Sequence, residues 1–219
     1  MPKTNFNDEM KRYDEWHLKS EYKRVAGGSI FESLEYREPY LRFEKLIIPH
    51  LKDNMKILEI AAGDGQYTNL ALQENSVSFI TDISQVSLKK ISLSKNLSKY
   101  NTHFIQCDMQ KLPFKENIFD IVIMTQSMSY GDISLVADEI NRVLLKGGKL
   151  FMLDSIYDNY FYTINRWIKY KRGFITKSSY QNRVTIKKLI DMSKKFNKYS
   201  ISTYNSLVFL YPFLKIFLS

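Results

Sequence analysis

Cysteine is almost absent from this sequence, since Cys107 is the only one among 219 residues. One cysteine cannot form an intramolecular disulfide, which excludes a disulfide-stapled secreted domain and suits a reducing compartment. The first residues lack the apolar stretch of a signal peptide. The most apolar segment, 207–218, is interrupted by Pro212 and Lys215 and is too short to span a bilayer. We therefore expect a cytoplasmic protein in which Cys107 is a buried, small hydrophobic residue at a strand end.

Acidic residues are scarce in the last third of the chain. Residues 151–219 hold 12 Lys and Arg against 3 Asp and Glu, whereas residues 1–54 and 55–150 each hold ten of either sign. The net charge of +9 therefore resides in the C-terminal third. A basic segment beside a neutral body suits an anionic substrate, a membrane face or nucleic acid, and a solvated basic surface explains it equally well.

The chain is organised around residues 55–65, MKILEIAAGDG. Residues 56–60 predict an apolar strand, the small residues after it let backbone approach a ligand, and a helix is predicted over 66–74. A second apolar run from Val77 ends at Asp82. In such a βαβ unit the carboxylate that ends the second strand accepts hydrogen bonds from ribose hydroxyls. We therefore expect a ligand that carries a ribose.

Two common nucleotide-binding patterns do not fit this turn. A dinucleotide fingerprint needs glycine or alanine where Thr68 stands, and a Walker loop needs Gly-Lys-Ser/Thr. The run from Glu59 to Gly65, EIAAGDG, instead resembles the first motif of class I S-adenosylmethionine-dependent methyltransferases. Ala61 departs from that motif, which usually has glycine there, and we expect its methyl group to narrow the turn without closing it. The resemblance implies S-adenosyl-L-methionine as the cofactor.

Further features follow in the order of that family over residues 55–154. Asp108 and Met109 come after a strand predicted at 103–106 and match the family's residues that accept from the adenine amino group and pack on its ring. Residues 142–148 resemble the family's R-V-L-K-P-G-G turn, with Gly147 in place of proline. The resemblance implies these cofactor-binding residues: Glu59, Ala61, Gly63, Asp64, Gly65, Asp82, Ile83, Asp108, Met109 and Gln126.

The fold implied by the resemblance is α/β, with a Rossmann-like, seven-stranded, mostly parallel sheet and helices on both faces. We expect a single methyltransferase domain over residues 1–219, divided into a helical lid (1–54), a cofactor-binding core (55–154) and an acceptor region (155–219). Two closing strands are predicted in that last region, at 199–204 and 206–211. No metal is expected, because no paired Asp, Glu or His cluster follows the fourth strand.

The N-terminal segment resembles the helical lid of small-molecule methyltransferases, and one of its helices is predicted to open at Pro39. Transfer of an activated methyl group needs mainly positioning, with a general base only where a hydroxyl must lose its proton. His17 is the candidate base, although a buried structural role stays open. Tyr13, Gln126 and Tyr130 are the other candidate catalytic residues, expected near the transferred methyl group.

The acceptor region resembles methyltransferases of surface-polysaccharide or nucleotide-sugar biosynthesis. Arg166, Lys169, Arg172 and Arg183 are the expected acceptor-binding residues, because charge-assisted hydrogen bonds from them suit the phosphates of a nucleotide-linked or phosphorylated sugar. The expected reaction is methylation of a hydroxyl of such a small anionic acceptor. The same segment suits equally an anionic membrane face, as a basic aromatic helix.

Two other functions stay open, namely RNA methylation, which would also use the basic tail, and a cofactor-binding regulator without turnover. Nucleic acid is the less favoured partner for two reasons. Residues 124–131 lack the Asn/Asp-Pro-Pro-Tyr/Phe quartet of enzymes that methylate exocyclic amines of nucleobases. A nucleophilic cysteine is also missing, because Cys107 is expected on the cofactor side. Peripheral membrane contact and either a monomer or a homodimer remain open. The sequence does not name the acceptor atom, because specificity lies in its least recognisable third.

Overall fold

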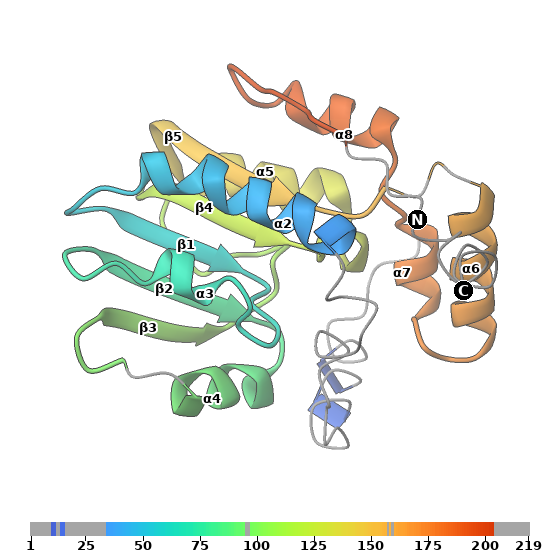
Figure 1. The fold of residues 1–219 in the computed structure, drawn as a ribbon, viewed down its shortest axis with the longest axis horizontal. Coiled ribbons are helices and arrows are strands. Elements are labelled where there is room, and N and C mark those ends of the chain that lie inside the picture. The colour runs from blue at the N-terminus through green and yellow to red at the C-terminus, as the bar shows by residue number, and fades with distance from the viewer. Residues whose placement is uncertain are drawn as a thin grey trace.

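The sheet of this protein is parallel throughout its described strands. The computed structural model describes residues 10–11, 14–15, 34–94, 97–156, 158 and 160–203. Within them, five strands form one sheet in the order β3-β2-β1-β4-β5 (Figure 1). The strands are β1 (Lys56–Ile60), β2 (Val77–Asp82), β3 (Asn101–Gln106), β4 (Phe119–Thr125) and β5 (Leu144–Leu153). Because every neighbouring pair is parallel, all carboxyl ends meet at one edge.

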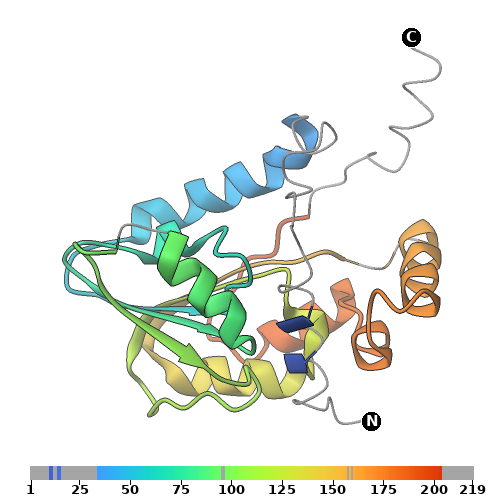
Figure 2. The same ribbon diagram turned by 90° about the horizontal axis from the view of Figure 1, so that it is seen from below.

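Helices cover both faces of this sheet. They are α2 (Leu34–Ile47), α3 (Thr68–Ala71), α4 (Gln85–Ser94), α5 (Ile133–Val143), α6 (Tyr160–Lys171), α7 (Lys177–Gln181) and α8 (Ile186–Ser193), with 3-10 turns η2 (Ile48–His50) and η3 (Met128–Tyr130). Seen from below, α2 and α4 lie on one face and α5 lies on the other (Figure 2). The fold is thus the α/β arrangement that the sequence predicts.

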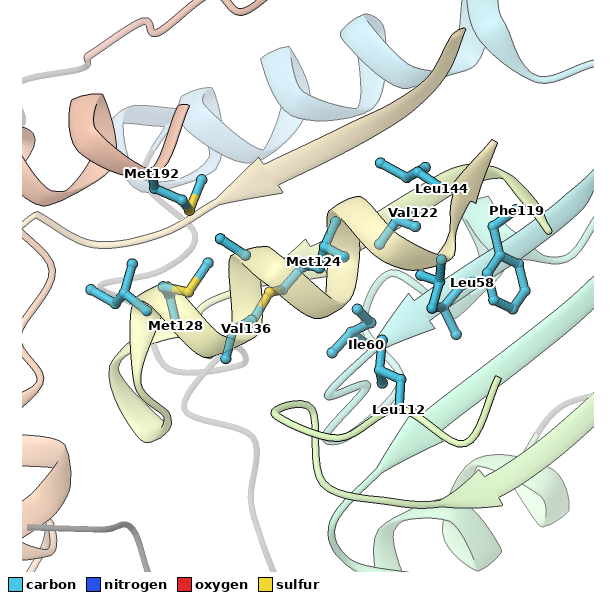
Figure 3. Close-up of a cluster of buried hydrophobic side chains, with 14 of the residues drawn as sticks. Leu58, Ile60, Leu112, Phe119, Val122, Met124, Met128, Val136, Leu144 and Met192 are labelled. Carbon is cyan, nitrogen blue, oxygen red and sulfur yellow. The ribbon is translucent and has the colours of Figure 1, made fainter. Parts of the chain in front are cut away.

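Apolar side chains alternate between the two faces of the central strands, as in a sheet buried on both sides. One buried cluster joins the sheet to α2, α3 and α4, and it contains Phe43, Ile47, Ile57, Ala71, Ile80, Leu88, Ile91, Ile121 and Ile123. The opposite cluster (Figure 3) joins it to α5 and α8, and it contains Leu58, Ile60, Val122, Met124, Val136, Ile140, Leu189 and Met192. These two layers hold the strand ends of the site in place.

Two expectations about the architecture are wrong. The described residues form a five-stranded sheet, not a seven-stranded one, because residues 199–203 of the first predicted closing strand are not a strand. The second predicted closing strand, 206–211, lies outside the described residues. Pro39 does not open a helix, since α2 begins at Leu34 and contains this proline.

Arg142, in the last turn of α5, fastens the loop between β3 and β4. Its guanidinium donates to the carbonyl oxygens of Phe114 (2.7 Å) and Leu112 (3.0 Å) and pairs with Glu139 at 2.7 Å. Glu139 accepts in turn from the backbone N–H of Leu112 at 2.7 Å, and the hydrogen bond from Arg142 lowers the pKa of this carboxyl. The arginine of the motif at 142–148 therefore holds the loop that begins at Asp108.

Candidate active site

The sheet order places the candidate residues in a row along the carboxyl edge. Asp108 follows β3, Asp82 ends β2, residues 61–65 follow β1, Gln126 follows β4 and Asp154 follows β5. Between β1 and β4 the strand order reverses, and open parallel sheets bind ligands at such a switch point. From the roles predicted for their residues, we call the carboxyl ends of β3, β2 and β1 the cofactor side of the row and those of β4 and β5 the acceptor side.

The turn after β1 is built from left-handed backbone. Ala61, Gly63 and Gly65 have φ values of 54°, 55° and 73°. A Cβ on Gly65 would lie 2.8 Å from a side-chain carbon of Ile91, so only glycine fits against α4. A Cβ on Gly63 would meet nothing within 4 Å, so this part of the turn borders open space. Ala61 keeps the backbone conformation that glycine favours, despite its methyl group.

Asp82 closes this turn from the neighbouring strand. One carboxylate oxygen accepts from the backbone N–H of Gly63 at 2.8 Å, and the other accepts from that of Ser84 at 2.8 Å. The side chain is only 6% exposed, so these donors replace water around the charge. Ser87 donates through its hydroxyl to the carbonyl oxygen of Gly63. Hydrogen bonds within the protein therefore fix the shape of the turn.

S-adenosylmethionine fits these residues. Each carboxylate oxygen of Asp82 has a second lone pair in addition to the one used by a backbone donor, and ribose hydroxyls can donate to it. The open space beside Gly63 admits a ligand close to the backbone. Glu59 lies one residue from the end of β1, buried at 3% exposure, and Ile83 and Asp64 flank the same edge.

Asp108 and Met109 lie where an adenine ring is expected. Asp108 accepts from the backbone N–H of Gln110 at 2.8 Å and from its side-chain amide at 3.2 Å. The amide oxygen of Gln110 accepts in turn from the backbone N–H of Asp132 at 2.9 Å. The methyl group of Met109 lies 2.7 Å from where a Cβ on Gly131 would be, so the loops after β3 and β4 pack closely.

Two of the described N-terminal residues reach the cofactor side. The hydroxyl of Ser84 donates to Asp14, and the side-chain amide of Gln106 donates to the sulfur of Met10 at 3.2 Å. Ser84 and Gln106 adjoin the carboxyl ends of β2 and β3, so Met10 and Asp14 lie at that edge of the sheet. Tyr13 and His17, two of the candidate catalytic residues, lie outside the described residues, and their roles and that of the lid stay predictions.

On the acceptor side the prominent residue is Asp154, which the sequence prediction did not include among the site residues. Its carboxylate accepts from the backbone N–H groups of Met128 (2.8 Å) and Ser155 (2.7 Å). Burial raises the pKa of Asp154 to about 6, against the opposing effect of these donors and of the Arg166 charge. A lone acidic residue just after an apolar strand, as in FMLD, was the available indication in the sequence.

Gln126 lies beside Asp154. Its backbone N–H donates to the carbonyl of Leu153 at 2.8 Å, its φ is 51°, and its side-chain oxygen accepts from the hydroxyl of Ser155 at 2.8 Å. A positive φ in a residue other than glycine marks strain of order 1 kcal/mol, which is common at ligand sites. Tyr130, in η3, is half-buried at the same edge. Gln126 and Tyr130 are thus on the predicted acceptor side.

Tyr40 connects the two sides of the row. The charge of Asp154 contributes, after burial, to raising the pKa of Tyr40, so the two groups interact. The Tyr40 ring also stacks on Tyr67 with 5.9 Å between centroids, and Tyr67 follows the glycine turn directly. Helix α2 therefore brings an aromatic contact between the cofactor turn and the end of β5.

A cleft of about 2050 Å³ runs along β5. Its walls come from α2, the outer side of β5, α6, α8 and residues 196–203. Among the candidate residues it reaches Gln126, Asp154, Arg166 and Lys169, and it does not include the glycine turn or Asp82. The cleft is therefore an approach to the acceptor side and not the cofactor pocket itself.

The four predicted acceptor-binding residues do not share one place. Arg166 is 7% exposed, and its guanidinium donates to the carbonyl oxygen and, at 3.0 Å, to the hydroxyl of Ser179, which ties α6 to α7. Lys169 is exposed and lines the cleft with Arg166. Arg172 and Arg183 are exposed outside the cleft lining. Only the first two therefore line the same cleft as Asp154, and the acceptor role of all four stays a prediction.

No helix in the described ranges is both long enough and apolar enough to cross a membrane. Across the same ranges, His, Cys, Asp and Glu side chains do not gather in groups of three that could hold a metal ion. Cys107, just after β3, has a thiol whose pKa burial raises to about 12.

Comparison with known proteins identifies the central segment. Residues 58–152 match the family described as a methyltransferase domain. The ubiquinone/menaquinone biosynthesis C-methyltransferase UbiE of Paraburkholderia xenovorans is 28% identical over 54% of this chain and 54% of its own length. The protein of the same name from Burkholderia vietnamiensis is 29% identical with the same coverage. This chain thus spans about half the length of the curated relatives it matches.

Solved structures agree on the fold. A SAM-dependent methyltransferase from Aquifex aeolicus has a TM-score of 0.54 at 15% identity, with 85% of each chain covered. Phosphoethanolamine N-methyltransferase 1 of Haemonchus contortus, solved with phosphoethanolamine and S-adenosylhomocysteine, has a TM-score of 0.53 at 20% identity over 72% of this chain and 34% of its own. These identities establish a shared fold and nothing finer.

Proposed function

We propose that this chain, a class I S-adenosylmethionine-dependent methyltransferase, methylates a hydroxyl group of a small acceptor and uses Asp154 to accept the hydroxyl proton. When bound, the cofactor supplies a methyl group already activated on a sulfonium. Glu59, the turn 61–65, Asp82, Asp108 and Met109 would hold it on the β3, β2 and β1 side. The remaining chemistry falls to the acceptor side.

The observation that carries this proposal is the fixed, half-buried carboxylate of Asp154 at the acceptor end of the row. Two backbone donors orient it, and a pKa of about 6 keeps it ionised near neutral pH while leaving it a stronger base than an ordinary aspartate. Asp154 would accept the O–H proton of the acceptor. The bound cofactor would supply the methyl group to the acceptor oxygen, and its sulfur would keep the electron pair of the broken carbon–sulfur bond, so that the products would be S-adenosylhomocysteine and the methylated acceptor.

Neighbouring groups would position the acceptor. Gln126 offers its side-chain amide beside Ser155, and Lys169 lines the cleft with an exposed ammonium. An ammonium group in the cleft supports the prediction that the acceptor is anionic. The specific prediction stays a nucleotide-linked or phosphorylated sugar of glycan biosynthesis. Arg166 would act indirectly, because its charge opposes the rise in the pKa of Asp154.

A second candidate reaction is carbon methylation, favoured by the names of the curated relatives. The UbiE proteins are called C-methyltransferases of ubiquinone and menaquinone biosynthesis. The same base would serve, because removing the proton of a ring hydroxyl raises the nucleophilicity of a neighbouring ring carbon. Asp154 is thus common to both candidates, and the acceptor distinguishes them.

The test is a methyl-transfer assay with labelled S-adenosylmethionine on the purified full chain. The acceptor panel contains nucleotide-linked sugars, phosphorylated sugars, phenolic and quinol rings, and RNA. Label in an oxygen–methyl product together with S-adenosylhomocysteine supports the proposal, and label on a ring carbon supports the second candidate.

Two results would contradict both candidates. Label in RNA alone, with binding that weakens steeply as salt rises, would establish the nucleic-acid alternative. A regulator would be favoured by three results together: calorimetry shows saturable cofactor binding, no acceptor yields a product, and a protein partner co-purifies with the chain. NAD in the same titration is the control for a ligand that shares only the nucleotide part.

A further inference from the structure

Helix α6 carries an exposed apolar stripe. Tyr160, Ile164, Trp167 and Ile168 are 75%, 40%, 48% and 36% exposed. They recur at i, i+4, i+7 and i+8, so at about 100° per residue they share one side of the helix. Phe174, just beyond the helix, is 66% exposed. Large apolar side chains grouped in this way mark interaction surfaces, whereas single exposed ones are ordinary.

The other side of α6 packs within the protein. Arg166 is buried against α7 through its hydrogen bonds to Ser179, and the Tyr170 ring stacks on Tyr180 at 5.1 Å. In both ribbon views α6 lies at the rim, farther from the sheet than α7 (Figures 1 and 2). The apolar stripe is therefore the outer side of an outer helix.

The charge around this stripe has one sign. Residues 159–190 contain eight Lys and Arg and no Asp or Glu. Lys171 lies on the stripe itself by its spacing from Tyr160 and Ile164. Arg172 is exposed beside the stripe, and Lys169 is exposed on the opposite side of the helix. An apolar stripe beside basic residues complements a surface that is both apolar and anionic.

We propose that the outer side of α6 docks on the surface of an anionic lipid bilayer, with Trp167, Ile164 and Ile168 entering the interfacial region and Lys171 and Arg172 facing the lipid phosphates. Docking of this kind is peripheral, since the helix lies in the plane of the interface. Asn165 and Lys169 line the cleft from the side of the helix that faces away from the stripe, so a docked α6 does not cover the cleft.

The test uses the full chain and sedimentation with vesicles. Vesicles of phosphatidylcholine alone are compared with vesicles that also contain phosphatidylglycerol. We expect sedimentation only with the anionic vesicles, and release as salt rises. The sequence has two tryptophans, so Trp16→Phe leaves Trp167 as the single reporter, and its emission should shift to shorter wavelength on binding.

Matched variants locate the contact. Trp167→Gln should weaken vesicle binding at least about tenfold through lost apolar burial, and Lys171→Gln about fivefold through one lost charge. Leu93→Gln is the control, because Leu93 is 76% exposed on α4, away from α6. It should bind vesicles as the wild type does.

Three outcomes would overturn the docking proposal. They are no binding to anionic vesicles by the folded protein, equal binding by Trp167→Gln and wild type, and a wild-type dimer that Trp167→Gln dissociates without any vesicle binding. The last outcome would assign the stripe to a second copy of the chain. Because the assay needs neither cofactor nor turnover, its failure leaves the proposed methyl transfer untouched.

Discussion

The cofactor side and the acceptor side of the site are built in different ways. On the cofactor side, Asp82 accepts a hydrogen bond from the backbone N–H of Gly63 in the turn 61–65 and another from that of Ser84. Nearly all the residues on this side lie within two consecutive βαβ units. On the acceptor side, Asp154 interacts with Tyr40 of α2 and Arg166 of α6, which are far apart in sequence. One side is therefore local and the other is assembled from separate elements.

This difference separates binding from specificity. A local, backbone-held turn stays the same when distant parts of the chain change, so it suits a common cofactor. A site assembled from α2, β4, β5 and α6 changes whenever one of those elements changes, which suits a variable acceptor. Substitutions on the two sides should consequently affect different measured quantities.

Asp154→Asn gives the largest expected effect and tests the acceptor side. The variant keeps the shape of the side chain but removes the base, so we expect kcat to fall about 10²- to 10⁴-fold. The wild-type rate should rise with pH through about 6, the pKa of Asp154, and the variant should lose this rise. Cofactor affinity, measured by calorimetry, should stay unchanged. Equal pH profiles for both proteins would refute the role of Asp154 as the base.

The same pKa gives a stability prediction. Because the pKa of folded Asp154 is about 6 against an ordinary value of 3.8, the folded state binds the proton more tightly, and ionising the group opposes folding. Its stabilising contribution is present below pH 4 and lost as pH rises through 6. Between these limits the stability of the wild type relative to Asp154→Asn should fall by about 3 kcal/mol, as followed by denaturant unfolding at each pH.

Asp82→Asn tests the cofactor side. The amide of asparagine directs an N–H toward one of the two backbone donors and carries no charge to attract the ribose hydroxyls. We therefore expect about a 100-fold loss of S-adenosylmethionine affinity, which corresponds to weakening two charge-assisted hydrogen bonds to the ribose. Asp120→Asn is the matched control, since Asp120 also accepts from a backbone N–H, that of Lys56 at 2.8 Å, but at the opposite end of the sheet. If both variants lost the same affinity, the loss would reflect general destabilisation.

For this reason the local side is the part of the site that a sequence motif can locate. The strand, the turn and Asp82 lie within one βαβ unit, and the structure joins the turn to Asp82 through a hydrogen bond from Gly63. The cofactor-binding roles of these residues stay predictions. Asp154 was missed because its burial depends on α6 and on the loop after β4, which no local spacing encodes. The predicted phosphate ligand Arg166 is buried against Ser179 for the same reason, since basic composition alone does not tell an inner residue from an outer one.

Arg142→Ala tests whether the cofactor side depends on contacts distant in sequence. The variant removes hydrogen bonds to the carbonyl oxygens of Leu112 and Phe114 and leaves Glu139 without this partner. We expect a loss of about 2 kcal/mol in the free energy of unfolding and weaker adenine binding, because the loop from Asp108 loosens. Arg142→Lys should recover only part of the loss, since one ammonium cannot serve both carbonyls and the carboxylate. An unchanged unfolding midpoint in urea would contradict this account.

Ala61→Gly has the smallest expected effect and tests how strictly the local turn is specified. Alanine with a φ of 54° costs about 1–2 kcal/mol, and glycine loses about 0.4–1 kcal/mol through the entropy of the unfolded chain. The two terms nearly cancel, so the free energy of unfolding should rise by less than about 1 kcal/mol. Ala62→Gly is the control, because Ala62 lacks a positive φ, so glycine there relieves no strain and brings the entropic loss together with the loss of a buried methyl group. If both variants destabilise the protein equally, the left-handed backbone at Ala61 carries no strain. The hydrogen bond from Gly63 to Asp82 would then not be needed to hold the turn in a strained conformation.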